Sequence, residues 1–162
     1  MRKIFISLMI FGFCIGCATT YQKKGFTGGY SDTQLGENMF KVTFRGNGYT
    51  SSERALDFCL LRCADLAIEH EFPYFIIINA SEDVSHSTYT TPTTATTTTR
   101  VDYFGNLISD TKINGGETYI ISKPSAANTI VCFKEKPTDI AVVYDASFIT
   151  NSIREKYRIK DR

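Results

Sequence analysis

An unbroken helical pattern between two strand patterns, within residues 39–79, constrains the fold more than any other feature. Residues 39–45 alternate apolar and polar side chains, which predicts a half-buried strand. From Thr50 to His70, apolar residues recur every three or four positions with no Gly or Pro, which predicts an amphipathic helix. Residues 74–79 (YFIIIN) are β-branched or aromatic almost throughout, which predicts a central strand buried on both faces. This strand, helix and strand form the predicted nucleus of the fold.

The helix start is predicted from a capping box. The Thr50 hydroxyl is expected to accept from the Glu53 amide, while the Glu53 side chain reaches back. The other face of the helix is charged and is expected to face solvent. Its residues are Arg54, Asp57, Arg62, Asp65 and Glu69.

Two more strands and a second helix are predicted in the C-terminal half. Residues 117–122 and 127–134 are expected to form a hairpin through Lys123-Pro124-Ser125, and Asp145 is expected to cap a final helix. The 162 residues, 43% of them apolar, are enough for one domain. We therefore expect a single α+β domain over residues 39–158. It has a mostly antiparallel sheet of four or five strands, the long helix packed on one face and the short C-terminal helix.

A Thr-rich segment at about residues 81–99 interrupts these elements. It contains nine Thr and three Ser, and its only aliphatic residues are Val84 and Ala95, so it contributes little to a core. Because Thr is a good strand former, a polar hairpin arm and a disordered segment are both compatible with it. In the hairpin interpretation, the returning strand covers residues 100–108.

The N-terminus has the order of a secretory signal. Arg2 and Lys3 precede an apolar run over residues 4–15, and small residues follow it. The apolar run is about a dozen residues long, whereas a membrane-spanning helix needs ~20, which disfavours a retained transmembrane anchor. The sequence therefore predicts that residues 1–16 are a signal peptide, which is removed.

The segment Cys14-Ile15-Gly16-Cys17 resembles the lipobox of bacterial lipoproteins, with Cys14 where Leu is usual. The resemblance implies that Cys17 becomes the first residue of the mature chain and carries fatty acyl chains such as palmitate. These chains would hold the protein on the membrane without a basic patch. Ala18 is not the Asp that marks inner-membrane retention, so the resemblance implies the periplasmic face of the outer membrane. An ordinary signal peptide cut near Ala18 is the alternative.

Residues 17–38 are rich in Gly and polar side chains and are predicted to be a tether. Its two aromatic residues, Phe26 and Tyr30, are expected to dock on the domain, because an exposed ring leaves apolar surface in water. The formal net charge of +1 lacks the basic excess of a nucleic-acid-binding protein. We expect no DNA or RNA partner.

Two motifs carry a family resemblance. Residues 26–35 (FTGGYSDTQL) and 44–51 (FRGNGYTS), followed by 122–125 (SKPS), are similar to a family of small envelope lipoproteins of Gram-negative bacteria. The resemblance implies a location in the cell envelope and supplies no chemistry.

A glycine turn between the first strand and the helix resembles part of a dinucleotide-binding loop. Gly46 and Gly48 have the right spacing, but Ser51 stands at the third glycine position and no acidic residue ends the 74–79 strand. A tight strand-to-helix turn is the favoured interpretation, and we predict no cofactor.

Cysteine residues supply the other candidate chemistry. Cys59, Cys63 and His70 lie on one side of the helix, but His70 is about 10 Å along the axis from Cys63, too far for one metal ion. We predict that Cys59 and Cys63 are small packing residues. A disulfide of either one with Cys132, and a metal or redox site, are the alternatives.

Two polar clusters have ordinary interpretations. His86 lies near Asp83, Ser85 and Ser87 in a segment without the fixed geometry of a catalytic triad. The basic C-terminal run (Arg154, Lys156, Arg158, Lys160 and Arg162) is predicted to be a solvated helix face, with contact to anionic lipid or an acidic partner as the alternative.

We therefore predict a non-catalytic, lipid-anchored envelope module that binds the membrane through Cys17 and has a possible envelope protein partner. A periplasmic thiol-redox or metal-binding protein that uses Cys59, Cys63 and Cys132 is the alternative.

Overall fold

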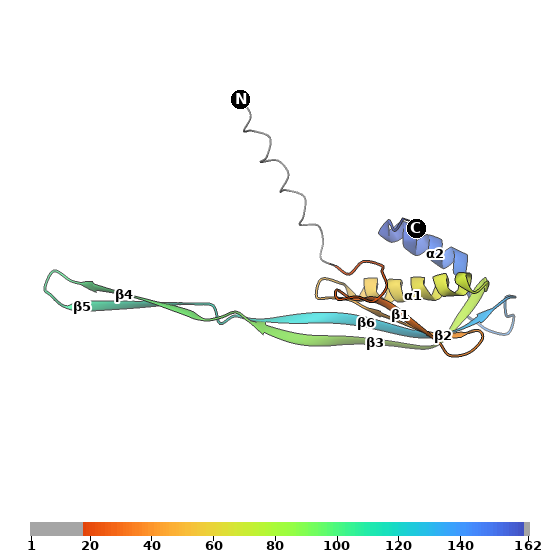
Figure 1. The fold of residues 1–162 in the computed structure, drawn as a ribbon, viewed down its shortest axis with the longest axis horizontal. Helices are drawn as coiled ribbons and strands as arrows, with labels where there is room; N and C mark the ends of the chain where they lie inside the picture. The colour runs from red at the N-terminus through yellow and green to blue at the C-terminus, as the bar shows by residue number, and fades with distance from the viewer. Residues whose placement is uncertain (1–17, 161–162) are drawn as a thin grey trace, which may run out of the picture. The chain divides into compact units, whose positions relative to one another are not determined.

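The structure, a computed structural model, describes residues 18–160 and has two compact units. The first unit, the body, contains residues 18–85 and 122–160, and the second, the arm, is His86–Ile121. The elements are β1 (Gly29–Gln34), β2 (Met39–Arg45), α1 (Ser52–Glu69), β3 (Tyr74–Thr90), β4 (Thr94–Val101), β5 (Leu107–Asn114), β6 (Thr118–Phe133), β7 (Tyr144–Asp145) and α2 (Ala146–Tyr157) (Figure 1). The predicted α+β class is confirmed.

The body is built on a five-stranded antiparallel sheet with the strand order β1-β2-β6-β3-β7. β2 and β3, which flank α1 in the chain, are not neighbours, because β6 lies between them. Both strands are antiparallel to β6 and are therefore parallel to each other. The predicted strand-helix-strand nucleus is thus a split βαβ unit, completed by β6, which follows β3 and the arm in the chain.

The core lies between α1 and one face of the sheet (Figure 1). β2 contributes Phe40, Val42 and Phe44, as its alternation predicts, and alternate residues of β6 from Ala126 to Cys132 lie on the same face. α2 packs against α1 and buries Ile153, with Ile149 and Tyr157 at the border of the core. These three residues form one apolar stripe along α2.

β3 differs from its prediction. It extends to Thr90, and only Phe75 is fully buried, while Ile78 is exposed. The prediction of a strand buried on both faces is wrong, because α1 and α2 cover a single face of the sheet and leave alternate β3 side chains on the other face.

The hairpin predicted at Lys123-Pro124-Ser125 is also wrong, because β6 continues through these residues. Pro124 has no N–H to donate, and it lies where the pairing of β2 with β6 ends, at Arg45 and Ser125. Its carbonyl oxygen accepts from Gly46 N–H at 2.8 Å. The proline therefore marks the end of one strand pair and not a turn.

The predicted tether contains a strand, since β1 pairs with β2 over its whole length and places Tyr30 opposite Phe44. Tyr30 packs on the core, as expected, but Phe26 is fully exposed, and the prediction that it docks on the domain is wrong. Gly28 and Gly29 have φ angles of 105° and 124°, and a Cβ at Gly28 would lie 2.3 Å from the Arg45 carbonyl oxygen. These glycines allow close backbone approach and do not indicate a flexible segment.

In the arm, the structure shows the hairpin interpretation of the Thr-rich segment. β4 pairs with β5 from Thr94 opposite Asn114 to Val101 opposite Leu107, around a turn at residues 102–106 that the Asp102 carboxylate caps. The returning strand therefore starts at Leu107, not at the predicted residue 100. Threonine hydroxyls bond across the arm, as at Thr97 and Thr111 (2.9 Å).

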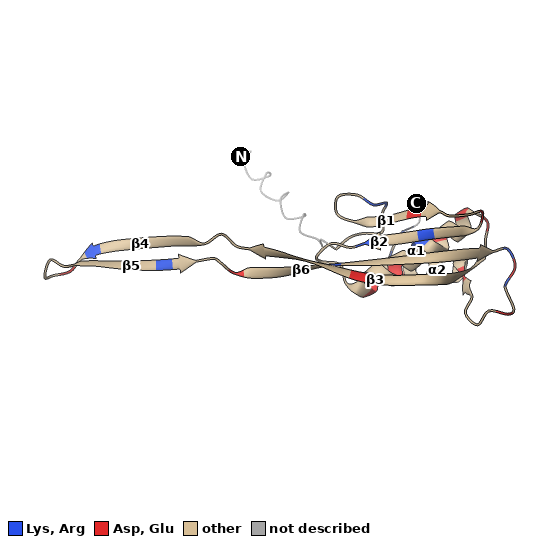
Figure 2. Ribbon diagram, turned by 90° about the horizontal axis from the view of Figure 1, so that it is seen from below, with Lys and Arg blue, Asp and Glu red and all other residues tan. Residues whose placement is uncertain are grey.

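The two faces of the β4–β5 hairpin differ in charge. One face carries Arg100, Asp110 and Lys112. Figure 2 shows blue Lys or Arg segments on both β4 and β5. The other face has no charged residue. It contains Ala95, Thr97, Thr99, Val101, Leu107, Ser109, Thr111 and Ile113.

Candidate functional site

The N-terminal end of the described residues is fixed by a network around Thr19, which is 1% exposed. Its N–H donates to the Thr50 hydroxyl oxygen at 3.0 Å, and its own hydroxyl donates to the Thr27 carbonyl oxygen at 2.7 Å. The same hydroxyl accepts from Asn47 N–H at 3.0 Å. Thr19 therefore ties the segment at residues 18–20 to the turn before β1 and to the turn before α1.

This network explains the glycine turn at residues 46–48. A Cβ at Gly46 would lie 2.6 Å from the Thr50 Cβ, so glycine is needed for the approach of Thr50. The Gly46 N–H donates to Pro124, and the Asn47 N–H donates to Thr19 and Thr50. These amides have partners within the protein, which supports the structural interpretation of the turn over a phosphate-binding one.

The network also changes the predicted helix cap. Ser51, not Thr50, is the N-cap of α1, and its hydroxyl accepts from Arg54 N–H at 3.2 Å. The predicted capping box is wrong because the Thr50 hydroxyl binds Thr19 and Asn47 instead. The helix itself ends as predicted, with His70 as its C-cap.

The charged face of α1, predicted to be solvated, is largely covered. The Asp65 carboxylate accepts from the Tyr21 hydroxyl at 2.6 Å, from Thr150 at 3.3 Å and from the Arg154 guanidinium at 3.0 Å. Nearby, Asp57 accepts from Lys156 at 2.7 Å and from the Tyr157 hydroxyl at 2.8 Å. These contacts fasten α2 and the N-terminal segment onto α1.

The Asp65 cluster borders a cavity of about 260 Å³ that Tyr21, Arg62 and Glu69 also line. Burial raises the pKa of Tyr21 far above its ordinary value, and the adjacent Asp65 carboxylate adds to this increase. The Arg62 guanidinium binds Asp32 at 2.9 Å and Glu69 at 2.6 Å and lies over the Tyr30 ring. Through Asp32 and Tyr30, both on β1, the Arg62 side chain holds β1 against α1.

Cys59, Cys63 and Cys132 are free thiols buried in the core, and no disulfide joins them. The Cys59 Sγ lies 3.7 Å from the Val42 carbonyl oxygen, and the Asn128 side-chain amide lies 3.9 Å from the Cys63 Sγ. Burial raises the pKa of Cys63, and it raises that of Cys132 to about 11. A hydrogen bond with Cys63 lowers the pKa of Cys59, against the effect of burial.

These three thiols fill the space between α1 and the sheet, which supports the packing interpretation. Within residues 18–160, no group of three or more His, Cys, Asp or Glu side chains is arranged to hold a metal ion.

The two histidines lie in different units. His70 ends α1, with its ring centroid 4.7 Å from that of Phe40 in the body. His86 lies on β3 in the arm, with neighbours Ser85 and Ser87 that point to the opposite face of the strand. The strand geometry therefore does not bring these side chains together as a triad.

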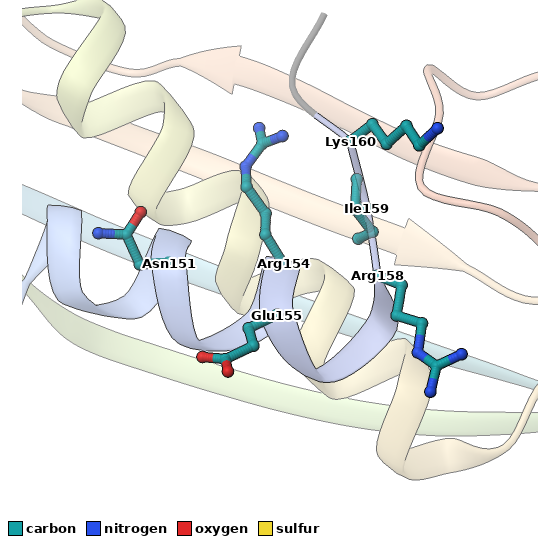
Figure 3. A pocket seen from close by; sticks show the side chains of 6 residues that line it. All are labelled: Asn151, Arg154, Glu155, Arg158, Ile159 and Lys160. Atoms are coloured by element: carbon teal, nitrogen blue, oxygen red, sulfur yellow. The ribbon is translucent and has the colours of Figure 1, made fainter.

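The basic C-terminal run divides into two groups. Arg154 and Lys156 form ion pairs with α1, whereas Arg158 and Lys160 are exposed beyond the last turn of α2. Figure 3 shows both exposed side chains extending away from this helix, at a surface depression of about 410 Å³. Arg162 lies outside the described residues.

The candidate lipidation residue, Cys17, and the predicted signal peptide also lie outside the described residues. Among residues 18–160, neither helix is long and apolar enough to cross a membrane. Comparison of the chain with protein-family models, curated proteins and solved structures finds no match.

Sequence reasoning missed Thr19 and Asp65 as organising residues. Thr19 gave no signal, because a single Thr after a candidate cleavage position is unremarkable. Asp65 did give one, since α1 and α2 carry opposite charges on faces that meet in the structure.

Proposed function

We propose that this chain is a lipid-anchored lipoprotein of the bacterial cell envelope, held through an acylated Cys17 at the periplasmic face of the outer membrane, and that it acts as a non-catalytic binding module. The observation that supports the proposal is how firmly the body holds Thr19, two positions after Cys17. Thr19 is buried and makes three hydrogen bonds, so an acyl anchor on Cys17 would connect to the folded body through only two residues.

The lipobox resemblance supplies the chemistry of the anchor. Acylation of Cys17 adds about 0.8 kcal/mol of membrane affinity for each buried methylene, and two or more chains make the attachment stable. The body needs no apolar helix for this purpose.

Mass analysis of the membrane fraction tests the anchor. We expect a mature chain that begins at Cys17 and carries acyl groups, whereas Cys17→Ala is expected to remain unprocessed and without lipid. Cys14→Leu is the matched control, since it changes the neighbouring cysteine and restores the usual lipobox residue. An unmodified mature chain from the wild type would refute the anchor.

The arm is the proposed binding element for an envelope protein. Its turn exposes Tyr103 (98%) and Phe104 (85%), and the β4–β5 hairpin presents the uncharged face described above. A two-stranded hairpin is marginally stable in water by itself, so contact with a partner would stabilise it. Exposed aromatic residues are frequent anchors of protein interfaces.

Photo-crosslinking in living cells tests the arm. A photoreactive residue at position 103 or 104 is expected to form adducts with one or a few envelope proteins, whereas the same residue at Lys41, exposed on β2, is not. Equal adducts from all three positions, or none from the arm, would contradict a binding role for the arm.

A further inference from the structure

The turn before β1 exposes an aromatic ring next to a residue that holds Thr19. Gly25 and Gly28 bond to each other through their backbones (2.9 and 3.3 Å), which places Phe26 and Thr27 at the tip of a tight hairpin. Phe26 is fully exposed, although the next residue, Thr27, holds Thr19 through its carbonyl oxygen.

A second exposed ring lies next to another hydrogen-bonding partner of Thr19. Tyr49 is 75% exposed, and it directly precedes Thr50, whose hydroxyl accepts from the Thr19 N–H. Each of the two rings is therefore on a residue adjacent to a hydrogen-bonding partner of Thr19. Exposed aromatic side chains are typical of protein surfaces that lie at the level of the lipid headgroups.

Basic side chains gather around the same point. Lys23 and Lys24 lead into the turn that carries Phe26, and both are exposed. Arg158 lines a hollow together with Thr19 and Thr20. Lys160 lines the cavity described above, whose carboxylates, Asp65 and Glu69, are paired with Arg154 and Arg62. Glu155, the nearby acidic residue on α2, points away from Arg158 in Figure 3.

The chain leaves little distance between this surface and the anchor. Two Cα–Cα steps separate Cys17 from Thr19, which is at most about 7.6 Å. Thr19 is fixed by three hydrogen bonds, so an acylated Cys17 would bring the residues around Thr19 to the depth of the headgroups.

We propose that Lys23, Lys24, Phe26, Tyr49, Arg158 and Lys160 form a membrane-docking surface that contacts anionic lipid headgroups of the leaflet holding Cys17. The inference rests on the proposed lipid anchor and adds a fixed orientation of the body to it. Each basic residue close to an anionic membrane contributes roughly a fivefold factor in binding, and the two rings insert at the interface.

Hydrogen exchange of the acylated full-length mature protein in vesicles tests the proposal. We expect amides of residues 23–28 and 47–49 to exchange at least fivefold more slowly in vesicles of phosphatidylethanolamine and phosphatidylglycerol than in phosphatidylcholine vesicles. Replacing Lys23, Lys24, Arg158 and Lys160 by Gln is expected to remove this difference, and Phe26→Ser with Tyr49→Ser is expected to reduce it.

The matched control replaces Lys41, Lys112, Lys134 and Lys136 by Gln, which removes the same charge elsewhere and is expected to leave the difference unchanged. Cooperative unfolding of each variant shows that it folds. Sedimentation with the vesicles reports the anchor separately, because acyl chains hold every variant on the membrane.

Two results would overturn the docking surface while leaving the anchor intact. One is an acylated, vesicle-bound protein with equal exchange in both lipids. The other is protection of these turns in native envelopes but not in pure lipid, which would assign the surface to a protein partner. A chain without acyl groups that fails to sediment would instead refute the proposed anchor.

Discussion

Removing the Thr50 hydroxyl should loosen the attachment of the segment around Thr19 to the body. In Thr50→Val, the shape of the side chain is kept, but the Thr19 N–H loses its acceptor at a buried position. The Asn47 N–H keeps Thr19 as a partner, and the Asn47 side-chain oxygen keeps the Tyr49 N–H. The substitution therefore leaves one buried donor unpaired.

An unpaired buried donor costs about 1–3 kcal/mol, and this is the expected loss in the free energy of unfolding. Thr50→Ser is the matched variant, since it keeps the hydroxyl and removes a methyl group, which costs about 1 kcal/mol. Urea unfolding of the mature chain with Cys17→Ser measures both values.

Hydrogen exchange separates the two variants more sharply than stability does. The Thr19 amide should remain protected in Thr50→Ser and should lose its protection in Thr50→Val. If Thr50→Val keeps this protection and unfolds within 0.5 kcal/mol (~RT) of the wild type, the Thr19 network does not fix the chain start.

Four further predictions follow from other contacts. Replacing the ~36-residue arm by Asn-Gly, joined to Ser85 and Ser122, should not lower the stability of the body, because no arm residue belongs to the core. The shorter connection also lowers the entropic cost of closing the loop on folding by up to ~2.6 kcal/mol. Loss of cooperative urea unfolding would contradict this prediction. Cys59→Ala and Cys63→Ala should each cost about 1 kcal/mol, and both native thiols should react slowly with an alkylating agent; bound stoichiometric metal or fast alkylation near neutral pH would favour the redox or metal alternative. Burial raises the pKa of Cys132 to about 11, so between about pH 9 and 11 the folded protein keeps a proton that the unfolded chain loses. The free energy of unfolding should therefore fall as the pH rises through this range, and Cys132→Ala should make the fall less steep. Asp65→Asn should lower the stability by about 2 kcal/mol through weaker bonds to Tyr21 and Arg154, and an unchanged urea midpoint would show that this cluster does not fasten α2.

Periodicity predicted the elements whose burial is decided locally. The alternation in β2 and the three- and four-residue spacing in α1 each create one apolar face, and the structure buries both faces against each other. Asp145 was predicted as a cap because its carboxylate can reach the helix amides, and it accepts from the Phe148 N–H at 2.9 Å. These features depend on neighbours within a few residues.

The errors concern contacts between distant segments. β1 was predicted as a tether because Gly28 and Gly29 are typical of flexible chain, whereas here they allow close packing against Arg45 and Gln22. Pro124 was assigned to a turn because the position where β2 ends cannot be known from residues 117–134 alone. Lipidation of Cys17 stays a prediction, and the sequence did not indicate the network around Thr19, because its hydrogen-bonding partners lie 8 to 31 residues away in the chain.

The short edge strand β7 leaves most of β3 without a neighbour on one side. β7 pairs only with Tyr74 and Phe75, so from Ile76 onwards this side of β3 presents unpaired backbone groups. The run Ile76-Ile77-Ile78, in which Ile78 is exposed and the other two are half-buried, is rich in β-branched residues, and such an edge can add a strand from another molecule. Glu82 and Asp83, further along the same strand, act against this by charge repulsion. Crowded chains of this protein would therefore aggregate through the first half of β3, and overproduction should yield β-rich precipitate that Ile78→Lys reduces.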